Sequence, residues 1–433
     1  MSTGKDCLSP VERLPSLPVP TDQALVHTDI TYPEGGLAAW LVVLGAWCGL
    51  TASLGLYNST GVLEAYISRE ILPQQSPSTI GWIFGIYSFM TFFCGTQVGP
   101  TFDAKGPRGL LIAGSICTLI GIFLLSICTE YYHFILAFSI LAGAGSSLLI
   151  TPAMGSVAHW FFERRGLASG IAFTGAGFGG VLFPLIIQSL LPKIGWAWSV
   201  RVLGLILFFL CLTSVVFCRS RVPPRNGPRT AWRDTLPSMR IFMDGTGATY
   251  YLERQGLPHG KMLTDEAAFA YQLLAVINSA SCVGRYLAGD LADRFRRYNT
   301  MIVSLSLCLL SVACFVLPDV LIPNMPGIAL LVIFTILFGF VSGSNVSLTP
   351  ICLGQLCETQ EYGRYYATCY TIASLGCLVS IPIAGSLLDA TGHRGKERYW
   401  AAVVYTGVSY LAALLCFIWV RVRVKGWTWR TKW

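Results

Sequence analysis

Charged residues are scarce in this chain. Asp, Glu, Lys and Arg make up only 12% of the 433 residues, about half their share in a typical soluble domain. Apolar residues make up 54%, and the mean hydropathy is +0.60. This balance excludes a disordered chain and a nucleic-acid-binding protein. It predicts an all-α polytopic membrane protein whose surroundings are the lipid bilayer.

Paired cysteine motifs are also lacking. The fifteen cysteines are scattered, mostly inside apolar runs, and no Cys-x-x-Cys occurs. This excludes a secreted disulfide scaffold, and we expect neither a metal site nor a cofactor. The sequence has no His-Glu-x-x-His or Gly-x-Ser-x-Gly motif and no paired intramembrane aspartates. We therefore do not expect an enzyme.

Long apolar runs fill most of the sequence. Residues 1–36 are polar, contain five prolines and lack an apolar core, which indicates a disordered cytosolic tail rather than a signal peptide. After this tail come eleven runs of about twenty residues, the length at which a helix crosses a bilayer. The predicted spans are 37–57, 79–100, 109–129, 132–153, 167–191, 197–218, 268–290, 300–317, 327–350, 365–388 and 400–420.

The basic residues gather in alternate loops and in the tail 421–433, which predicts that both termini are cytosolic, with the plasma membrane as the expected location. These residues are Lys105, Arg108, Arg164, Arg165, Arg219, Arg221, Arg225, Arg229, Arg233, Arg294, Arg296, Arg297, Arg421, Arg423, Lys425, Arg430 and Lys432. With this orientation, the segment 219–267 must cross the membrane. It carries Asp244, Glu253 and Arg254, each of which costs a few kcal/mol at mid-membrane. A seventh helix is therefore apparently missing or degenerate.

An internal repeat supports this interpretation. Gly99 and Asp103 match Gly289 and Asp293 at an offset of 190, each pair forming a Gly-x-x-x-Asp motif with basic residues after it. Further matches at an offset of 198 relate Gly145-Ser146, Thr151-Pro152 and Pro184 to Gly343-Ser344, Thr349-Pro350 and Pro382. Such repeats are typical of transporters. We predict an N-terminal half of six helices over 37–218 and a C-terminal half of five over 268–420.

Four segments resemble a known family. Pro33–Trp40 (PEGGLAAW) and Trp160–Gly180 (WFFERRGLASGIAFTGAGFGG) are similar to the two signatures of the monocarboxylate-transporter-like branch of the major facilitator superfamily, with fungal members the most alike. Gly289–Arg294 (GDLADR) resembles the loop motif of the superfamily, and Gly99–Arg108 its first-half copy. The resemblance implies the major-facilitator fold of two pseudo-repeated halves.

The family implies a secondary active transporter that moves a small organic solute by alternating access. The solute is then a monocarboxylate or related organic anion, or a metabolite exported from a biosynthetic pathway. Carboxylate-carrying members place a lysine where this chain has Asn58 and an aspartate where it has Ser281, so proton coupling stays open. The alternatives are a membrane solute sensor that does not transport, and an inactive truncated transporter.

Arg285 is the main candidate for solute binding. It lies eight residues before Asp293, which places it roughly 12 Å inside the bilayer on a helix. Asn278 and Ser281 share its helical face, with Tyr271 two turns earlier. This stripe can hold a carboxylate in two hydrogen bonds. In the alternative interpretation, Arg285 is tied to backbone carbonyls or to an acid on a neighbouring helix.

Three further features complete the candidate sites. Tyr57 and Asn58 close the first span and are predicted to contact solute or to cap the outer interface. Asn58 also begins an Asn-x-Thr glycosylation acceptor. The remaining candidates are the loop charges, for which we predict gating between the halves, with helix termination and orientation as the alternative. These charges are Asp103, Arg108, Asp293 and Arg294.

Overall fold

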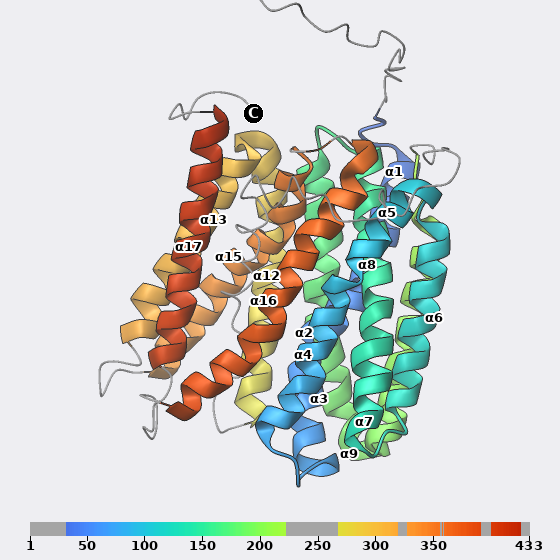
Figure 1. Cartoon of the computed structure of the whole chain (residues 1–433), viewed down its shortest axis with the longest axis vertical. Helices are drawn as coiled ribbons and strands as arrows, with labels where there is room; N and C mark the ends of the chain where they lie inside the picture. The colour runs from blue at the N-terminus through green and yellow to red at the C-terminus, as the bar shows by residue number, and fades with distance from the viewer. Residues whose placement is uncertain are drawn as a thin grey trace, which may run out of the picture. The chain divides into compact units, whose positions relative to one another are not determined.

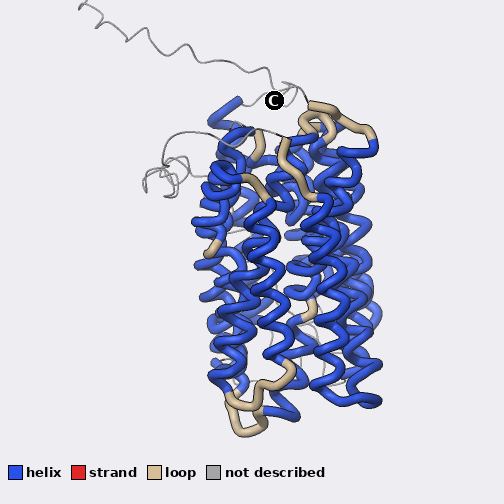
Figure 2. The backbone as a smooth tube through the Cα atoms, turned by 90° about the vertical axis from the view of Figure 1, so that its right-hand side faces the viewer, coloured by secondary structure: helices blue, strands red, loops and turns tan. Residues whose placement is uncertain are grey.

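The computed structural model describes residues 32–221, 267–318, 327–355, 357, 359–390 and 400–425. Within these ranges the regular secondary structure is entirely helical (Figure 2). The expected all-α fold is confirmed. Three predicted segments lie mostly outside the described residues: the tail 1–36, the inter-half segment 219–267 and the tail 421–433. The predicted loss of a seventh helix falls in the second of these segments and stays a prediction.

The helices of the first half follow the predicted spans. Short π-helical segments interrupt two of these spans, at Thr51–Gly55 and Ile135–Ala142. The long helix α9 covers two spans, which meet at Gly195, where the backbone φ of +74° breaks the helical path. The helices are α1 (Leu37–Leu50), α2 (Leu56–Asn58), α3 (Thr60–Tyr66), α4 (Pro77–Phe93), α5 (Gly95–Lys105), α6 (Arg108–Leu125), α7 (Tyr131–Phe134), α8 (Gly143–Trp160) and α9 (Arg165–Phe217).

The second half is described as five long helices. They are α12 (Ala267–Phe295), α13 (Arg297–Ser311), α15 (Gly327–Leu353), α16 (Tyr362–Ala390) and α17 (Trp400–Lys425). All eleven predicted apolar runs therefore fall on helices. In the part of the chain that the structure describes, eight helical spans are long and apolar enough to cross a membrane, and α9 counts as one of them.

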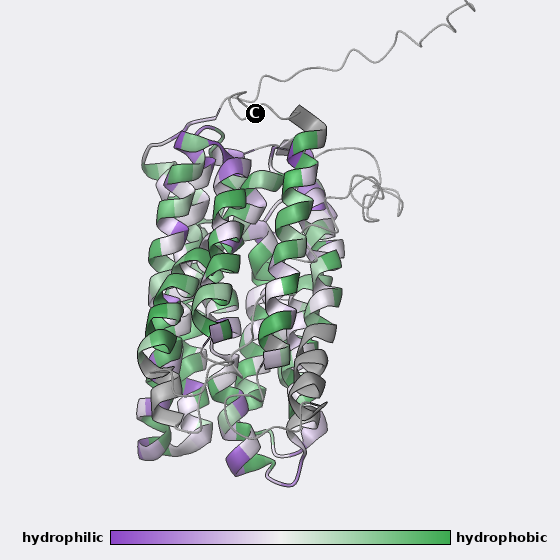
Figure 3. Ribbon diagram, turned by 90° about the vertical axis from the view of Figure 1, so that its left-hand side faces the viewer, coloured by the Kyte–Doolittle hydropathy of each residue, from purple (hydrophilic) through white to green (hydrophobic). Residues whose placement is uncertain are grey.

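The outer surface of the helices is apolar, as lipid contact requires. Ile116, Phe209 and Leu415 each leave more than half of their surface exposed, and apolar residues line the outer helix faces (Figure 3). Polar side chains such as Ser146 and Asn345 are buried between helices. This distribution is that of an integral membrane protein.

Glycines let α9 approach helices of both halves closely. A Cβ atom on Gly179 would lie 2.7 Å from the Cα atom of Gly55 in the first span. On the other side of α9, a Cβ atom on Gly166 would lie 2.5 Å from the carbonyl oxygen of Gly289 in α12. Backbones can meet at these distances only where no side chain intervenes. The fifth-span part of α9 therefore lies between the first span and α12.

One end of the helical bundle carries the basic loops, and we call it the basic end. There α5 ends at Lys105, α6 begins at Arg108, α9 begins at Arg165 and α12 ends at Phe295 (Figure 1). α17 also ends there, at Lys425. The described helices thus bring the charged loop residues of both halves to one end of the bundle.

Candidate functional site

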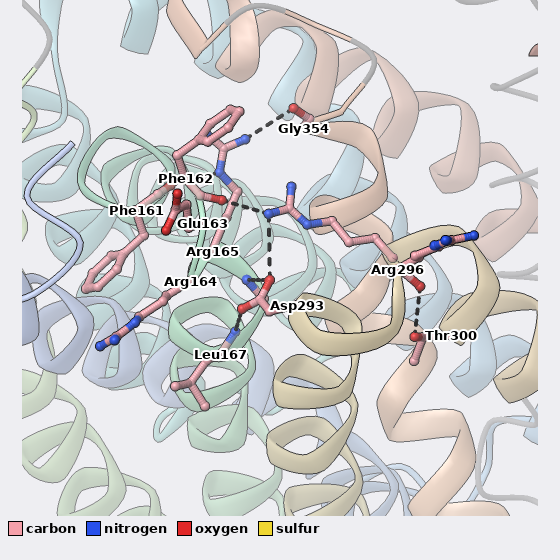
Figure 4. Close-up of polar contacts among 12 residues, drawn as sticks. Phe161, Phe162, Glu163, Arg164, Arg165, Leu167, Asp293, Arg296, Thr300 and Gly354 are labelled. Atoms are coloured by element: carbon pink, nitrogen blue, oxygen red, sulfur yellow. Dashed lines mark hydrogen bonds and ion pairs between the residues drawn. The ribbon is translucent and has the colours of Figure 1, made fainter. Parts of the chain in front are cut away.

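Asp293 joins the two halves at the basic end. Its Oδ1 atom accepts a hydrogen bond from the backbone N–H of Gly166 at 2.9 Å, and its Oδ2 atom accepts from the N–H of Leu167 at 2.8 Å (Figure 4). These N–H groups lie in the first turn of α9, where a helix has no internal acceptors for them. A carboxylate is also favoured by the helix dipole at this end. The end of α12 thereby caps the start of α9.

Asp103 makes the equivalent contact from the first half to the second. Its two carboxylate oxygens accept from the backbone N–H groups of Gly363 at 3.1 Å and Arg364 at 2.8 Å, in the first turn of α16. Asp103 and Asp293 are 190 residues apart, and the capped N–H groups are 197 residues apart. The repeat thus places two equivalent contacts across the same interface. We call them the Asp103 clasp and the Asp293 clasp.

The Asp293 clasp has an additional arginine. Arg297 is buried and donates from Nη2 to the carbonyl oxygen of Phe162 at 2.7 Å. The same nitrogen lies 3.6 Å from Oδ1 of Asp293 (Figure 4). At an offset of 190, the residue equivalent to Arg297 is Pro107. The two clasps are therefore related by the repeat, but the position of Arg297 is taken by a proline in the first half.

Arg165 is fully buried beside the Asp293 clasp. It comes from the first half, yet its Nη1 atom donates to the carbonyl oxygen of Gly354 in the second half at 3.2 Å (Figure 4). Its Nε and Nη2 atoms donate to the carbonyls of Phe161 and Ala158, each at 3.0 Å. The guanidinium also lies 5.7 Å from the ring centroid of Tyr362, close enough for a cation–π contact. These acceptors compensate for burial of its charge.

Glu34 fixes the loop that leads into α9. Its carboxylate accepts three backbone hydrogen bonds, from the N–H groups of Phe162 at 2.6 Å, Glu163 at 2.9 Å and Arg164 at 3.0 Å. Glu34 itself has a positive φ of 51°, which is uncommon outside glycine. Two carboxylates, one from each half, therefore hold the backbone from Phe162 to Leu167.

Tyr32 reaches from the first half to the second over this loop. Its hydroxyl lies 2.7 Å from Oγ1 of Thr359, just before α16. Its ring stacks on that of Phe162 with the centroids 5.3 Å apart. The contacts described above join the two halves at the basic end.

The charges predicted to gate lie in different environments. Asp103 and Asp293 both reach the contact between the halves, as their proposed role requires. Across the halves, however, Asp293 binds backbone N–H groups rather than an arginine side chain. Arg294 is 70% exposed and pairs with Asp290 of its own helix at 2.9 Å, and Arg108 is exposed at the start of α6. Their roles stay predictions.

The predicted solute-binding stripe is buried between α12 and its neighbours. Arg285 donates from Nη1 to the carbonyl oxygen of Phe173 in α9 at 2.8 Å, which is the backbone contact considered as the alternative. Asn278 donates to the carbonyl of Gly180 at 3.2 Å, and Ser281 packs against α15. The side chain of Tyr271 lies outside the described residues. Solute contact by this stripe stays a prediction.

Asn58 and Tyr57 lie in the first half, at the same depth as this stripe. The amide nitrogen of Asn58, the atom to which a glycan would be attached, donates to the carbonyl of Ala176 in α9 at 3.0 Å. Tyr57 packs its ring against Tyr87 and Phe92. Asn58 and Asn278 thus bind carbonyls one turn apart on α9, from opposite halves.

Sequence reasoning missed Arg165 and Glu34 as contributors to this site. Arg165 lies in a run of charged residues after a span, where orientation in the membrane is the usual explanation. Glu34 lies within the PEGGLAAW segment, but nothing in that segment indicates which backbone it binds. The short gap between α8 and α9 was the available signal, because it requires a fixed turn.

Comparisons with known proteins agree with this architecture. The model of the Major Facilitator Superfamily matches residues 37–321 and 264–432. The chain belongs to the Major Facilitator Superfamily. It is 32% identical to the riboflavin transporter MCH5 of Saccharomyces cerevisiae, over 92% of this chain and 81% of the relative. It is 33% identical to the MFS transporter asaE of Aspergillus flavus, over 91% of this chain and 89% of the relative.

Two solved structures share the fold. The human organic anion transporter MFSD10 superposes with a TM-score of 0.64 at 15% identity, covering 88% of this chain and 98% of that one. The proton:xylose symporter XylE gives 0.66 at 14% identity, covering 90% and 96%. The major-facilitator fold is confirmed, and the relatives are transporters rather than enzymes. The monocarboxylate-transporter-like branch stays a prediction.

Proposed function

We propose that this superfamily transporter carries a small organic solute by alternating access and that the two carboxylate clasps form its gate at the basic end. The observation that carries the proposal is the repeat symmetry of the clasps. Asp103 and Asp293 each cap a helix of the opposite half. Both contacts can break by a rocking of rigid halves, without the loss of a hydrogen bond inside any helix.

The clasps suit a gate because their strength is moderate. A hydrogen bond to a charged group contributes about 1.5–3 kcal/mol, and the N–H groups released on opening are hydrated by water instead. The closed state is therefore favoured without being locked. A solute bound between the halves shifts this balance by its different affinity for the two states.

The site for the solute is proposed near α9 at the depth of Asn58, Asn278 and Arg285. The guanidinium of Arg285 favours an anionic or oxygen-rich group. The names of relatives include a riboflavin transporter and efflux proteins for aspyridones in Emericella nidulans and for fujikurins in Gibberella fujikuroi. We infer that the solute is an organic metabolite larger than a simple monocarboxylate. We also infer that the protein lies in the plasma membrane with its basic end facing the cytosol.

Net solute flux tests this function. The full chain would be reconstituted in liposomes, and uptake of radiolabelled riboflavin, with L-lactate as a second solute, would be followed with and without a proton gradient. A transporter gives saturable net flux that the double variant Asp103→Asn/Asp293→Asn slows. Saturable binding without flux of either solute would instead indicate a sensor. Proton coupling is expected to appear as a dependence of flux on the gradient.

A further inference from the structure

A row of aromatic rings runs through the first half and crosses into the second. The ring of Phe138 stacks on Tyr87 with the centroids 4.4 Å apart, and Tyr87 faces Tyr57 at 6.3 Å. Phe92 at the end of α4 then stacks on Tyr370 of α16 at 5.5 Å, with the ring planes 26° apart. Both rings of this last pair are buried. The pair lies where the two halves must separate if they rock.

The row continues along α16 towards the basic end. Tyr370 contacts Tyr366 at 4.5 Å, and Tyr366 stacks on Tyr362 at 5.9 Å. The row ends at Arg165, whose guanidinium lies near the ring of Tyr362. Figure 1 shows α4 and α16 side by side along this path. The rings therefore connect the middle of the bundle with the residues that close the basic end.

The repeat indicates that the fold does not require this ring pair. At the offsets of 190 and 197, the residues equivalent to Phe92 and Tyr370 are Cys282 and Phe173. Cys282 donates from Sγ to the carbonyl of Thr174 at 3.4 Å, so the equivalent contact between α12 and α9 uses a thiol where the other uses a ring. Among the described side chains, this α12–α9 contact is made without stacked rings. The ring pair is therefore particular to the contact of the first half with α16.

We propose that Phe92 and Tyr370 form the two faces of a binding site for a flat, conjugated solute. The inference rests on the proposed transport function, because the site becomes available when the halves separate. Aromatic faces bind flat ring systems by offset stacking and tolerate many ring substituents. One turn after Phe92, Oγ1 of Thr96 lies 2.5 Å from Oγ1 of Thr371, the residue that follows Tyr370. These two hydroxyls can bind polar atoms at the edge of the inserted ring.

Two flat fluorophores test the site, lumiflavin and 7-hydroxycoumarin, because equilibrium dialysis measures their free concentration by fluorescence, whichever ring they stack on. The full chain in lipid nanodiscs would be titrated with each of them. We expect saturable binding, with a dissociation constant at least tenfold higher in Phe92→Leu and Tyr370→Leu. Tyr370→Phe keeps the ring and is expected to bind within twofold of the original chain. Phe334→Leu is the matched control, since Phe334 stacks on Phe338 within α15.

A further variant tests the site if the leucine variants do not fold. Thr371→Val keeps both rings and is expected to raise the dissociation constant of lumiflavin about threefold by removing a hydroxyl from the edge. The proposal is overturned if neither fluorophore binds saturably, if the ring and hydroxyl variants bind as the original chain does, or if equimolar L-lactate displaces lumiflavin.

Flux in liposomes separates this inference from the proposed function. If the fluorophores bind with the expected ring dependence but no net flux of any solute is found, the binding site stands and the transport proposal fails. If L-lactate is carried and neither fluorophore binds, transport stands and the aromatic site is rejected.

Discussion

Asp103 and Asp293 are related by the internal repeat, and each caps the first turn of a helix in the half to which it does not belong. This relationship gives the Gly-x-x-x-Asp motif a structural role, which is to cap the first turn of a helix in the opposite half. In each half the motif supplies a carboxylate at the end of a span, and the opposite half supplies two N–H groups without internal acceptors. We propose that the gate of the transporter lies at this shared end.

Neutralising one clasp should change turnover more than affinity. Asp293→Asn removes the charge that faces the start of α9 and Arg297, and it leaves one acceptor oxygen for two N–H groups. Because the gate closes less well, the maximal rate of uptake is expected to fall about tenfold, while KM changes less than threefold, as the loss of a single charged hydrogen bond implies. Initial rates in liposomes measure both.

The matched control for this prediction is Asp290→Asn, because Asp290 pairs only within its own helix turn with the exposed Arg294 among the contacts described here. It should leave both kinetic parameters within twofold. A loss of affinity with an unchanged maximal rate in Asp293→Asn would argue against a gate.

Adjacent arginines should differ in their effect on stability. Arg165→Ala leaves the carbonyls of Gly354 and Ala158 without the donor that Arg165 supplies. The side chain of Arg164 is exposed, and this residue contacts Glu34 through its backbone N–H. We expect Arg165→Ala to lower the melting temperature in detergent by roughly 5 °C, given about 2 kcal/mol for lost charged hydrogen bonds. Arg164→Ala should melt within 1–2 °C of the original chain, about the scatter of surface substitutions. Equal melting of the two variants would contradict this account.

Arg285 is expected to be needed for transport and not for insertion. Arg285→Ala removes the guanidinium from the contact of α12 with Phe173, so we predict that uptake is abolished while the amount of protein in the membrane is unchanged. Arg201→Ala is the control, because Arg201 lies over the ring of Trp198 and donates to Ser126, both in the first half. Undiminished uptake by Arg285→Ala would reject its assignment to the solute site.

Residues 236–262 are predicted to form no transmembrane helix. The polar and charged residues there make burial in lipid expensive. Single cysteines at Thr246, Gln255 and Lys261 should react with a membrane-impermeant maleimide in intact cells or in inside-out vesicles. Protection of all three positions from both sides would show that they are embedded in lipid, and the prediction would be wrong.

Much of the fold could be predicted from the sequence, because apolar runs of span length have few alternatives to a membrane helix. All eleven predicted runs fall on helices, including the two joined in α9. The carboxylates of Asp103 and Asp293 were also identifiable through the repeat. Their partners were not, since a backbone N–H has no side-chain signature and the capped residues lie more than 120 positions away.

Arg165 and Arg285 show the same limitation. Neighbouring charges along the chain give no indication that Arg165 is fully buried while Arg164 is exposed. For Arg285, the sequence left solute contact and backbone contact open, and the carbonyl of Phe173 became identifiable as an acceptor only when α9 and α12 were placed together.

The most direct test of the gate is a distance measurement across the basic end. Spin labels at positions 105 and 295, both exposed and in opposite halves, would report their separation by pulsed electron–electron double resonance in nanodiscs. The account predicts one short distance population in the original chain and a second, longer one in Asp103→Asn/Asp293→Asn. An unchanged distribution in the double variant would contradict the claim that the two carboxylates hold the basic end closed.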